Sequence, residues 1–183
     1  MSNKLLVIAG PTAVGKGTVV DYILNNFSNF HISVSATTRS PRPGEVNGRN
    51  YYFMSHDEFD SLVNSGQMLE FAVVHGDNKY GTPRKPVEDA LARGEHVILE
   101  IDIQGARQVK QAMPEAISIF IAPPSWEVLV DRLHARGTET AIEQQKRLET
   151  AKSELVSQGE FDHVVINDEV ARCASEVVEL IQD

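Results

Sequence analysis

The sequence predicts an α/β fold in which a parallel sheet is flanked by helices, and three observations support this prediction. Short apolar runs, typical of buried strands, alternate along the chain with longer stretches of helical periodicity. A glycine-rich turn joins the first apolar run to the first helix, as in the strand-turn-helix units of α/β proteins. The 183 residues suit one compact domain, and 42% of them are hydrophobic, which is enough for a core.

The elements of this core follow one another along the chain. Buried strands are expected at residues 5–9, 97–101, 117–121 and 164–166. Helices are expected at residues 18–24, 106–113, 126–135, 142–156 and 169–181. Ser125 and Asp168 stand just before two of these helices and are predicted to be their N-caps.

The middle of the chain has a different pattern, with short alternating strands linked by turns. The strands are expected at residues 32–35, 51–53 and 69–74, with turns at 43–44 and 47–48. Ser55 and Glu58 have the spacing of a capping box, which predicts that a helix begins there. We interpret this part as a small mixed α/β insertion on the parallel core, and we expect it to recognise the substrate.

Composition and charge exclude several classes of protein. The formal net charge of −9 argues against a surface that coats polynucleotides, because phosphate backbones are held mainly by lysine and arginine. The chain has neither an apolar run of membrane-spanning length nor the apolar segment of a signal peptide at its start. The single cysteine, Cys173, excludes an internal disulfide. We therefore expect a cytoplasmic protein without membrane or polynucleotide partners, and leave open whether it is a monomer or a homo-oligomer.

A candidate phosphate-binding loop lies between the first strand and the first helix. Its residues are Gly10, Pro11, Thr12, Ala13, Val14, Gly15, Lys16, Gly17 and Thr18. Backbone N–H groups and the helix N-terminus can bind a phosphate there, and Lys16 can reach the β and γ phosphates of a nucleotide. The alternative is a glycine-rich turn with a solvated lysine. Alone, the loop indicates only an NTPase or a kinase.

The loop departs from the usual pattern at one position. Gly17 stands where a serine or threonine usually holds magnesium, and the hydroxyl follows one place later at Thr18. The same Gly-Lys-Gly-Thr sequence occurs in adenylate kinases. We therefore expect magnesium to be held through water.

Seven further motifs resemble those of the guanylate kinase family, in the family's order and over nearly the whole chain. They lie at residues 33–45, 47–51, 69–72, 80–83, 100–105, 121–125 and 136–139. The resemblance implies a P-loop kinase core (1–32, 84–125 and 148–183), an insertion that binds GMP (33–83) and a helical lid region (126–147). It also implies phosphoryl transfer from MgATP to GMP, with dGMP as a second substrate.

The resemblance further implies which residues bind GMP. Ser35, Arg39, Arg42, Tyr51 and Tyr80 match the groups that hold the GMP phosphate in the family. Glu70, Thr82 and Glu100 match its guanine readers, and a carboxylate suits the two donors on one edge of guanine but would repel the N1 acceptor of adenine. The alternatives are solvated arginines and, for Glu70, an exposed carboxylate on a strand.

The remaining residues that the resemblance implies concern ATP and its metal. Asp102 ends a buried strand, and the resemblance implies that it lies near magnesium and contacts the ion through coordinated water. The alternative is that it caps a helix before Gly105. Arg132, Arg136 and Arg147 match the arginines that clamp ATP and the transferring phosphoryl group, with solvated helix arginines as the alternative. Asn167 is expected at adenine. The catalytic groups would be Lys16, Arg39, Asp102 and the three clamp arginines.

Two other functions are alternatives to this interpretation. A guanylate-kinase-like module without catalysis would bind a phosphorylated protein through the arginine pocket, but Lys16 and both loop glycines are present here. A related P-loop kinase would use another acceptor, such as AMP or a sugar phosphate. Glu70 and Glu100 argue against AMP.

Overall fold

The main sheet of the computed structural model, which describes residues 3–74, 76–135 and 140–181, is parallel throughout. Its five strands lie in the order β2-β7-β1-β8-β9. Their bounds are β1 Leu5–Ala9, β2 Phe30–Ile32, β7 His96–Glu100, β8 Ile117–Ala122 and β9 His163–Ile166. The predicted fold class and the four strands predicted for the core are therefore confirmed, whereas β2 was not predicted as part of this sheet.

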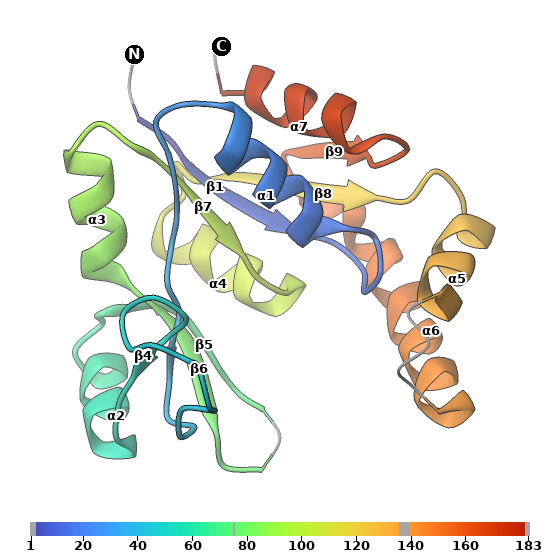
Figure 1. The fold of residues 1–183 in the computed structure, drawn as a ribbon. Coiled ribbons are helices and arrows are strands. Elements are labelled where there is room, and N and C mark those ends of the chain that lie inside the picture. Colours follow the sequence, from blue (N-terminus) through green and yellow to red (C-terminus); the bar gives the residue numbers. More distant parts are fainter. Residues whose placement is uncertain (1–2, 75, 136–139, 182–183) are drawn as a thin grey trace.

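Helices cover both faces of this sheet, and alternate residues of β1 face different layers (Figure 1). Leu6 and Ile8 belong to the core beneath α1 (Lys16–Asn26) and α7 (Val170–Glu179). Leu5 and Val7 belong to the core beneath α3 (Arg84–Ala92) and α4 (Ile103–Ala112). Because both faces are covered, the central strand β1 is apolar and buried throughout rather than alternating.

The insertion forms a second, mixed sheet of four strands in the order β4-β3-β6-β5. The strands are β3 Ala36–Thr37, β4 Tyr52–Phe53, β5 Met68–Val73 and β6 Lys79–Pro83. Together with α2 (His56–Asn64) it has a small core of its own, centred on the fully buried ring of Phe59. Figure 1 shows this sheet and α2 below the main sheet, beside α4.

One prediction for this region was wrong, and two elements were not predicted. The pattern over residues 32–35 is not one strand: β2 ends at Ile32 in the main sheet, and the chain joins the second sheet only at Ala36. Strand β6 and helix α3 were not predicted at all. Gly81 and Pro83 are poor strand formers, and β6 forms because it pairs with β3 on one side and β5 on the other.

Helix starts also differ in part from the prediction. Ser125 caps α5 as expected, because its hydroxyl accepts from the backbone N–H of Val128 at 3.3 Å. Helix α4 begins at Ile103 instead of Ala106. Asp168 is not the N-cap of α7: the cap position is Glu169, and the Asp168 carboxylate instead accepts from the Glu169 N–H and pairs with Arg172.

The expected lid region contains α5 (Trp126–Ala135) and the first turns of α6 (Ala141–Val156). Residues 136–139, with Arg136 among them, lie outside the described residues. The boundary expected at 147 falls inside α6, which runs on to Val156 and is followed by a 3-10 turn, η1 (Ser157–Glu160). In Figure 1, α5 and α6 lie to the right of the core, away from the insertion.

Two other expectations concern single features. Cys173 is a packed thiol as expected: it is fully buried, and burial raises its pKa to about 11. Among the helices within the described ranges, none combines the length and apolarity that crossing a bilayer requires.

The capping box of α2 yields a test of local stability. The Ser55 hydroxyl accepts from the Glu58 N–H, and the Glu58 carboxylate accepts from the Ser55 N–H at 2.7 Å. We expect Ser55→Ala to lower the free energy of unfolding by about 1 kcal/mol in urea denaturation, because both bonds lose their geometry. Ser61→Ala, within the same helix, is the control and should not destabilise the protein; equal loss in both variants would contradict the prediction.

Candidate active site

The turn after β1 has the backbone shape of a phosphate-binding loop. Gly15, the N-cap of α1, adopts a left-handed conformation with φ 95°, and a side chain there would lie 2.7 Å from the Asn167 amide. At Gly10, a Cβ would lie only 2.3 Å from the Ile121 carbonyl oxygen. Residues 11–13 and 15–18 line a cavity of about 290 Å³ together with Glu100. The two glycines thus allow the loop backbone to lie close against Ile121 and Asn167.

Lys16 lies across this loop. Its ammonium donates to the carbonyl oxygens of Gly10 at 2.6 Å and Pro11 at 3.1 Å. The positive charge is therefore held at the cavity, beside the N-terminus of α1. Thr18 is exposed one turn into the helix, and a side chain at Gly17 would point to the Glu100 carboxylate, at 3.6 Å.

Two of the predicted nucleotide residues support the loop from behind. The Arg132 guanidinium donates to the carbonyl oxygens of Val14 at 3.1 Å and Asn167 at 3.0 Å. The Asn167 amide donates to the same Val14 oxygen at 2.9 Å, and its residue is 2% exposed. This burial does not support the expected contact of the Asn167 side chain with adenine; its amide binds the loop instead.

Helix α6 approaches the loop from the other side. Arg147 donates to the Thr12 hydroxyl at 3.3 Å, as a loop-facing arginine should. Two turns later on the same face, Glu154 has a carboxylate oxygen that is buried without a hydrogen-bond partner. Burial raises the pKa of Glu154, while Lys16 and the Thr12 backbone N–H oppose the rise. Glu154 was not predicted as a site residue. The only indication in the sequence is that this acidic residue lies near the apolar residues Ala151 and Leu155 on the same helix.

Asp102 lies in the same area and has the capping role that was considered as its alternative. Its carboxylate accepts from the Gly105 N–H at 2.7 Å and so caps α4. The side chain is exposed and shares a cavity of about 430 Å³ with Glu154 and with polar residues of α6. Asp102 can therefore cap the helix and still offer an oxygen to the cavity.

Four of the residues predicted to bind GMP line a second cavity, of about 200 Å³, whereas Arg39, Arg42, Glu70 and Tyr80 are not part of its lining. Its lining includes Ser35, Arg49, Asn50, Tyr51, Thr82 and Glu100. Glu100 also lines the cavity of the phosphate loop. The two cavities therefore adjoin at the end of β7, where α/β sheets bind ligands.

Arg39 is not a solvated arginine. Its guanidinium pairs with both oxygens of Glu45, at 3.0 and 2.9 Å, and lies over the ring of Tyr51 at 5.5 Å. The pairing with Glu45, assisted by the Tyr80 hydroxyl, raises the pKa of Arg39 above its usual range. Arg42 has an exposed side chain, while its backbone N–H donates to Glu45 at 2.7 Å. No role was predicted for Glu45, although a carboxylate close in sequence to several arginines indicates an ion pair.

Glu70 and Thr82 form a buried polar pair. The Thr82 hydroxyl donates to the Glu70 carboxylate at 2.6 Å, and the two residues are 1% and 8% exposed respectively. Burial raises the pKa of Glu70, the Thr82 hydroxyl opposes the rise, and the charge of Asp102 adds to it. The alternative of an exposed strand carboxylate is therefore wrong. Glu100 is exposed at the end of β7, but partial desolvation of its carboxylate raises its pKa, and Lys16 opposes the rise.

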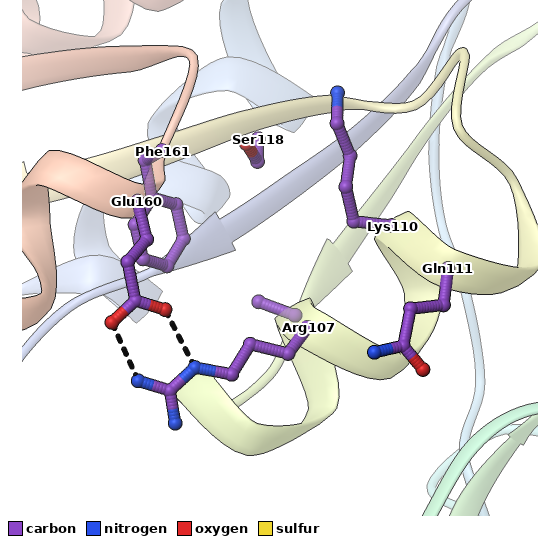
Figure 2. A pocket seen from close by; sticks show the side chains of 7 residues that line it. Arg107, Lys110, Gln111, Ser118, Glu160 and Phe161 are labelled. Carbon is purple, nitrogen blue, oxygen red and sulfur yellow. Dashed lines mark hydrogen bonds and ion pairs between the residues drawn. The ribbon is translucent and has the colours of Figure 1, made fainter.

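A further cavity, of about 220 Å³, lies where α4 meets β8 and η1. Figure 2 shows its lining, in which Arg107 makes two bonds to Glu160, at 2.6 and 2.7 Å. Lys110 pairs with Asp162 at 2.7 Å. Both cations are thus balanced by carboxylates of this chain, and the cavity contains none of the predicted site residues.

The family model described as guanylate kinase matches residues 2–183. The chain is 61% identical over 179 residues to the guanylate kinase of Leifsonia xyli subsp. xyli, covering 98% of this chain and 70% of that protein. It is 51% identical over 179 residues to the guanylate kinase of Nocardia farcinica, covering 97% and 93%. The crystal structure of guanylate kinase from Anaplasma phagocytophilum matches with a TM-score of 0.73 at 34% identity, covering 99% of this chain and 85% of that one.

Proposed function

Because the chain belongs to the guanylate kinase family, it is a nucleotide kinase that phosphorylates GMP with ATP, and we propose that its two adjoining cavities bind these two nucleotides. The phosphate loop would bind ATP, and the cavity of the insertion would bind GMP. The observation that carries this assignment is the position of Glu100, which lines both cavities. The two nucleotides would thus bind next to each other at the carboxyl end of β7.

The reaction we propose is an in-line transfer that gives ADP and GDP without a protein nucleophile. The GMP phosphate is the attacking group and is already anionic, so the reaction needs no general base. The protein would supply position and positive charge, through the loop N–H groups, Lys16, Arg147 and Arg39. Arg132 would act indirectly, because it supports the loop backbone at Val14. Arg136 is proposed as a further clamp group from the resemblance alone.

GMP would be held at its two ends. We propose that Ser35, Arg39, Arg42, Tyr51 and Tyr80 bind its phosphate. Glu70, Thr82 and Glu100 would bind its base, and the Thr82 hydroxyl already orients the Glu70 carboxylate. A carboxylate at the donor edge of guanine excludes adenine, whose N1 is an acceptor. The ribose 2′-hydroxyl has no predicted partner among these groups, so dGMP is proposed as a second substrate.

The oxygen donors near the loop suit magnesium, which prefers oxygen ligands and keeps several waters. We propose that the Thr18 hydroxyl and the Asp102 carboxylate hold the hydrated ion of MgATP. Glu154, one carboxylate oxygen of which is buried without a hydrogen-bond partner, lines the same cavity as Asp102. When bound, magnesium supplies positive charge that stabilises the phosphates in the transition state.

Closure of the insertion and the lid over both nucleotides belongs to the same proposal. Water at the γ-phosphate would hydrolyse ATP, so exclusion of water before transfer protects the reaction. We propose residues 33–83 as the GMP-binding part and 126–147 as the lid region, with the remaining chain as the core. A cytoplasmic location is proposed because both substrates are intracellular nucleotides.

The proposed function is tested by following ADP release from MgATP with GMP, dGMP, AMP, CMP, UMP or no acceptor. We expect turnover with GMP and dGMP only, at least about 10²-fold above AMP, because the carboxylates match guanine alone. Strong turnover with AMP would contradict the guanine-reading role of Glu70 and Glu100. No turnover with any acceptor in a folded protein would instead favour a phosphoprotein-binding module. Calorimetry would then test this alternative, because such a module should not bind ATP.

A further inference from the structure

Helix α4 packs its first turns against the strand that carries Glu70. A side chain at Gly105 would place its Cβ 3.1 Å from the Glu70 carboxylate and 3.3 Å from Ile101. Gly105 is helical, so its backbone does not require glycine, and glycine is a poor helix former. Glycine is therefore needed at position 105 for steric reasons, because the Glu70 carboxylate occupies the space that a larger side chain would fill.

One turn further along α4, Gln108 holds the next residue of the same strand. Its amide accepts from the Phe71 N–H at 3.1 Å and donates to the Phe71 carbonyl at 3.1 Å. Strand β5 is the last strand of its sheet, so these backbone groups face away from β6. The Gln108 amide thus satisfies them as a neighbouring strand would, and it fixes the backbone directly after Glu70.

Strand β6 confines Glu70 from the opposite direction. A Cβ at Gly81 would lie 2.6 Å from the Glu70 carbonyl oxygen, and the Thr82 hydroxyl binds the carboxylate. The register between β5 and β6 shifts between Met68 and Glu70, as at bulges that redirect a side chain. Backbone and carboxylate of Glu70 are therefore enclosed on both sides.

We propose that the Gly105–Gln108 face of α4 positions the Glu70 carboxylate and thereby sets the selectivity of this chain for guanine. The inference rests on the proposed function, because it concerns the base that Glu70 reads. Gly105 leaves space for the Glu70 carboxylate, and Gln108 fixes the position of strand β5 relative to α4. Both are positioning residues that act through Glu70, and α4 makes the core, rather than the insertion alone, part of base recognition.

The first test compares Gly105→Ala and Gly105→Ser with the natural protein. We expect the KM for GMP to rise at least about tenfold in Gly105→Ala and further in Gly105→Ser, because the carboxylate must move away from the base. The KM for ATP should stay within about twofold, since the phosphate loop is not touched. The thermal midpoint of Gly105→Ala should be equal or higher, because alanine is the better helix former. If Gly105 had only a structural role, Gly105→Ala would change the thermal midpoint but not the ratio of the KM for GMP to the KM for ATP.

The second test uses Gln108→Ala, with Gln111→Ala, one turn further on the same helix, as the matched control. Loss of the two bonds to Phe71 should raise the KM for GMP about two- to tenfold and reduce the preference for GMP over AMP in kcat/KM, while Gln111→Ala leaves both unchanged.

The measured KM values distinguish failure of this inference from failure of the proposed function. An unchanged KM for GMP in Gly105→Ala, or an equal rise for ATP, would overturn the inference. A natural protein without GMP turnover would refute the proposed function instead, so the two failures are distinguishable.

Discussion

Replacing Lys16 with alanine should lower the turnover number for GMP phosphorylation about 10³-fold, which is the scale on which single charge-stabilising groups act in phosphoryl transfer. In the free enzyme the ammonium is held by the Gly10 and Pro11 carbonyls, at the rim of the ATP cavity. We expect it to turn to the transferring phosphoryl group when ATP binds. The effect should appear in kcat, because the charge that it neutralises develops in the transition state.

The measurement is steady-state ADP release at saturating MgATP and GMP, together with a urea denaturation curve. Lys85→Ala is the matched control, because Lys85 lies on the surface of α3 and pairs with Asp89. It should keep full turnover. Turnover of Lys16→Ala within tenfold of the natural protein, with an unchanged unfolding curve, would refute the role of Lys16.

Replacing Glu70 with glutamine should raise the KM for GMP about 10²-fold and leave the KM for ATP unchanged. The amide keeps the size of the carboxylate, but its NH₂ group would face a donor of guanine, and a buried mismatch of this kind is costly. The Thr82 hydroxyl can still donate to the remaining oxygen, so the fold should be retained. Glu115→Gln makes the same change at an exposed position and should have no effect on either KM.

The acid side of the pH profile gives an independent measurement on Glu70. Burial raises its pKa above the ordinary 4.5, so the folded protein protonates this carboxyl at a higher pH than a solvated one. As the pH falls through that raised pKa, the acceptor is lost and the KM for GMP should rise. Glu70→Gln lacks this carboxyl and keeps only Glu100, whose pKa is also raised, so its KM should rise less on the acid side. The same acid limb in both proteins would contradict the assignment.

The core of the fold was predictable because its signals are local. Each buried strand is an apolar run, and the phosphate loop is one continuous stretch between strand and helix. Strand β6 could not be predicted in this way, since Gly81 and Pro83 disfavour a strand and only pairing with β3 and β5 makes one. Likewise, α3 follows Pro83 without a side-chain cap, so nothing in the sequence marked its start.

The residues of the candidate site likewise differ in whether the sequence or the tertiary packing reveals them. Glu70 and Thr82 were predicted from the resemblance of their motifs to those of the guanylate kinase family, and the structure brings these two into contact. Glu154 was not predictable, because its closeness to Lys16 depends on how α6 packs on the core. The burial of Asn167 behind the loop also arises from packing, through its bond to Val14.

The support behind the phosphate loop has a thermodynamic consequence for nucleotide binding. Fixing the backbone of a residue costs about 1–2 kcal/mol of conformational entropy, so a loop that became ordered only around ATP would lose several kcal/mol of affinity. Here Arg132 and Asn167 bind the Val14 carbonyl, and Lys16 binds two others, before any ligand arrives. That entropy is lost during folding instead, so most of the interaction energy with the phosphates remains available as affinity.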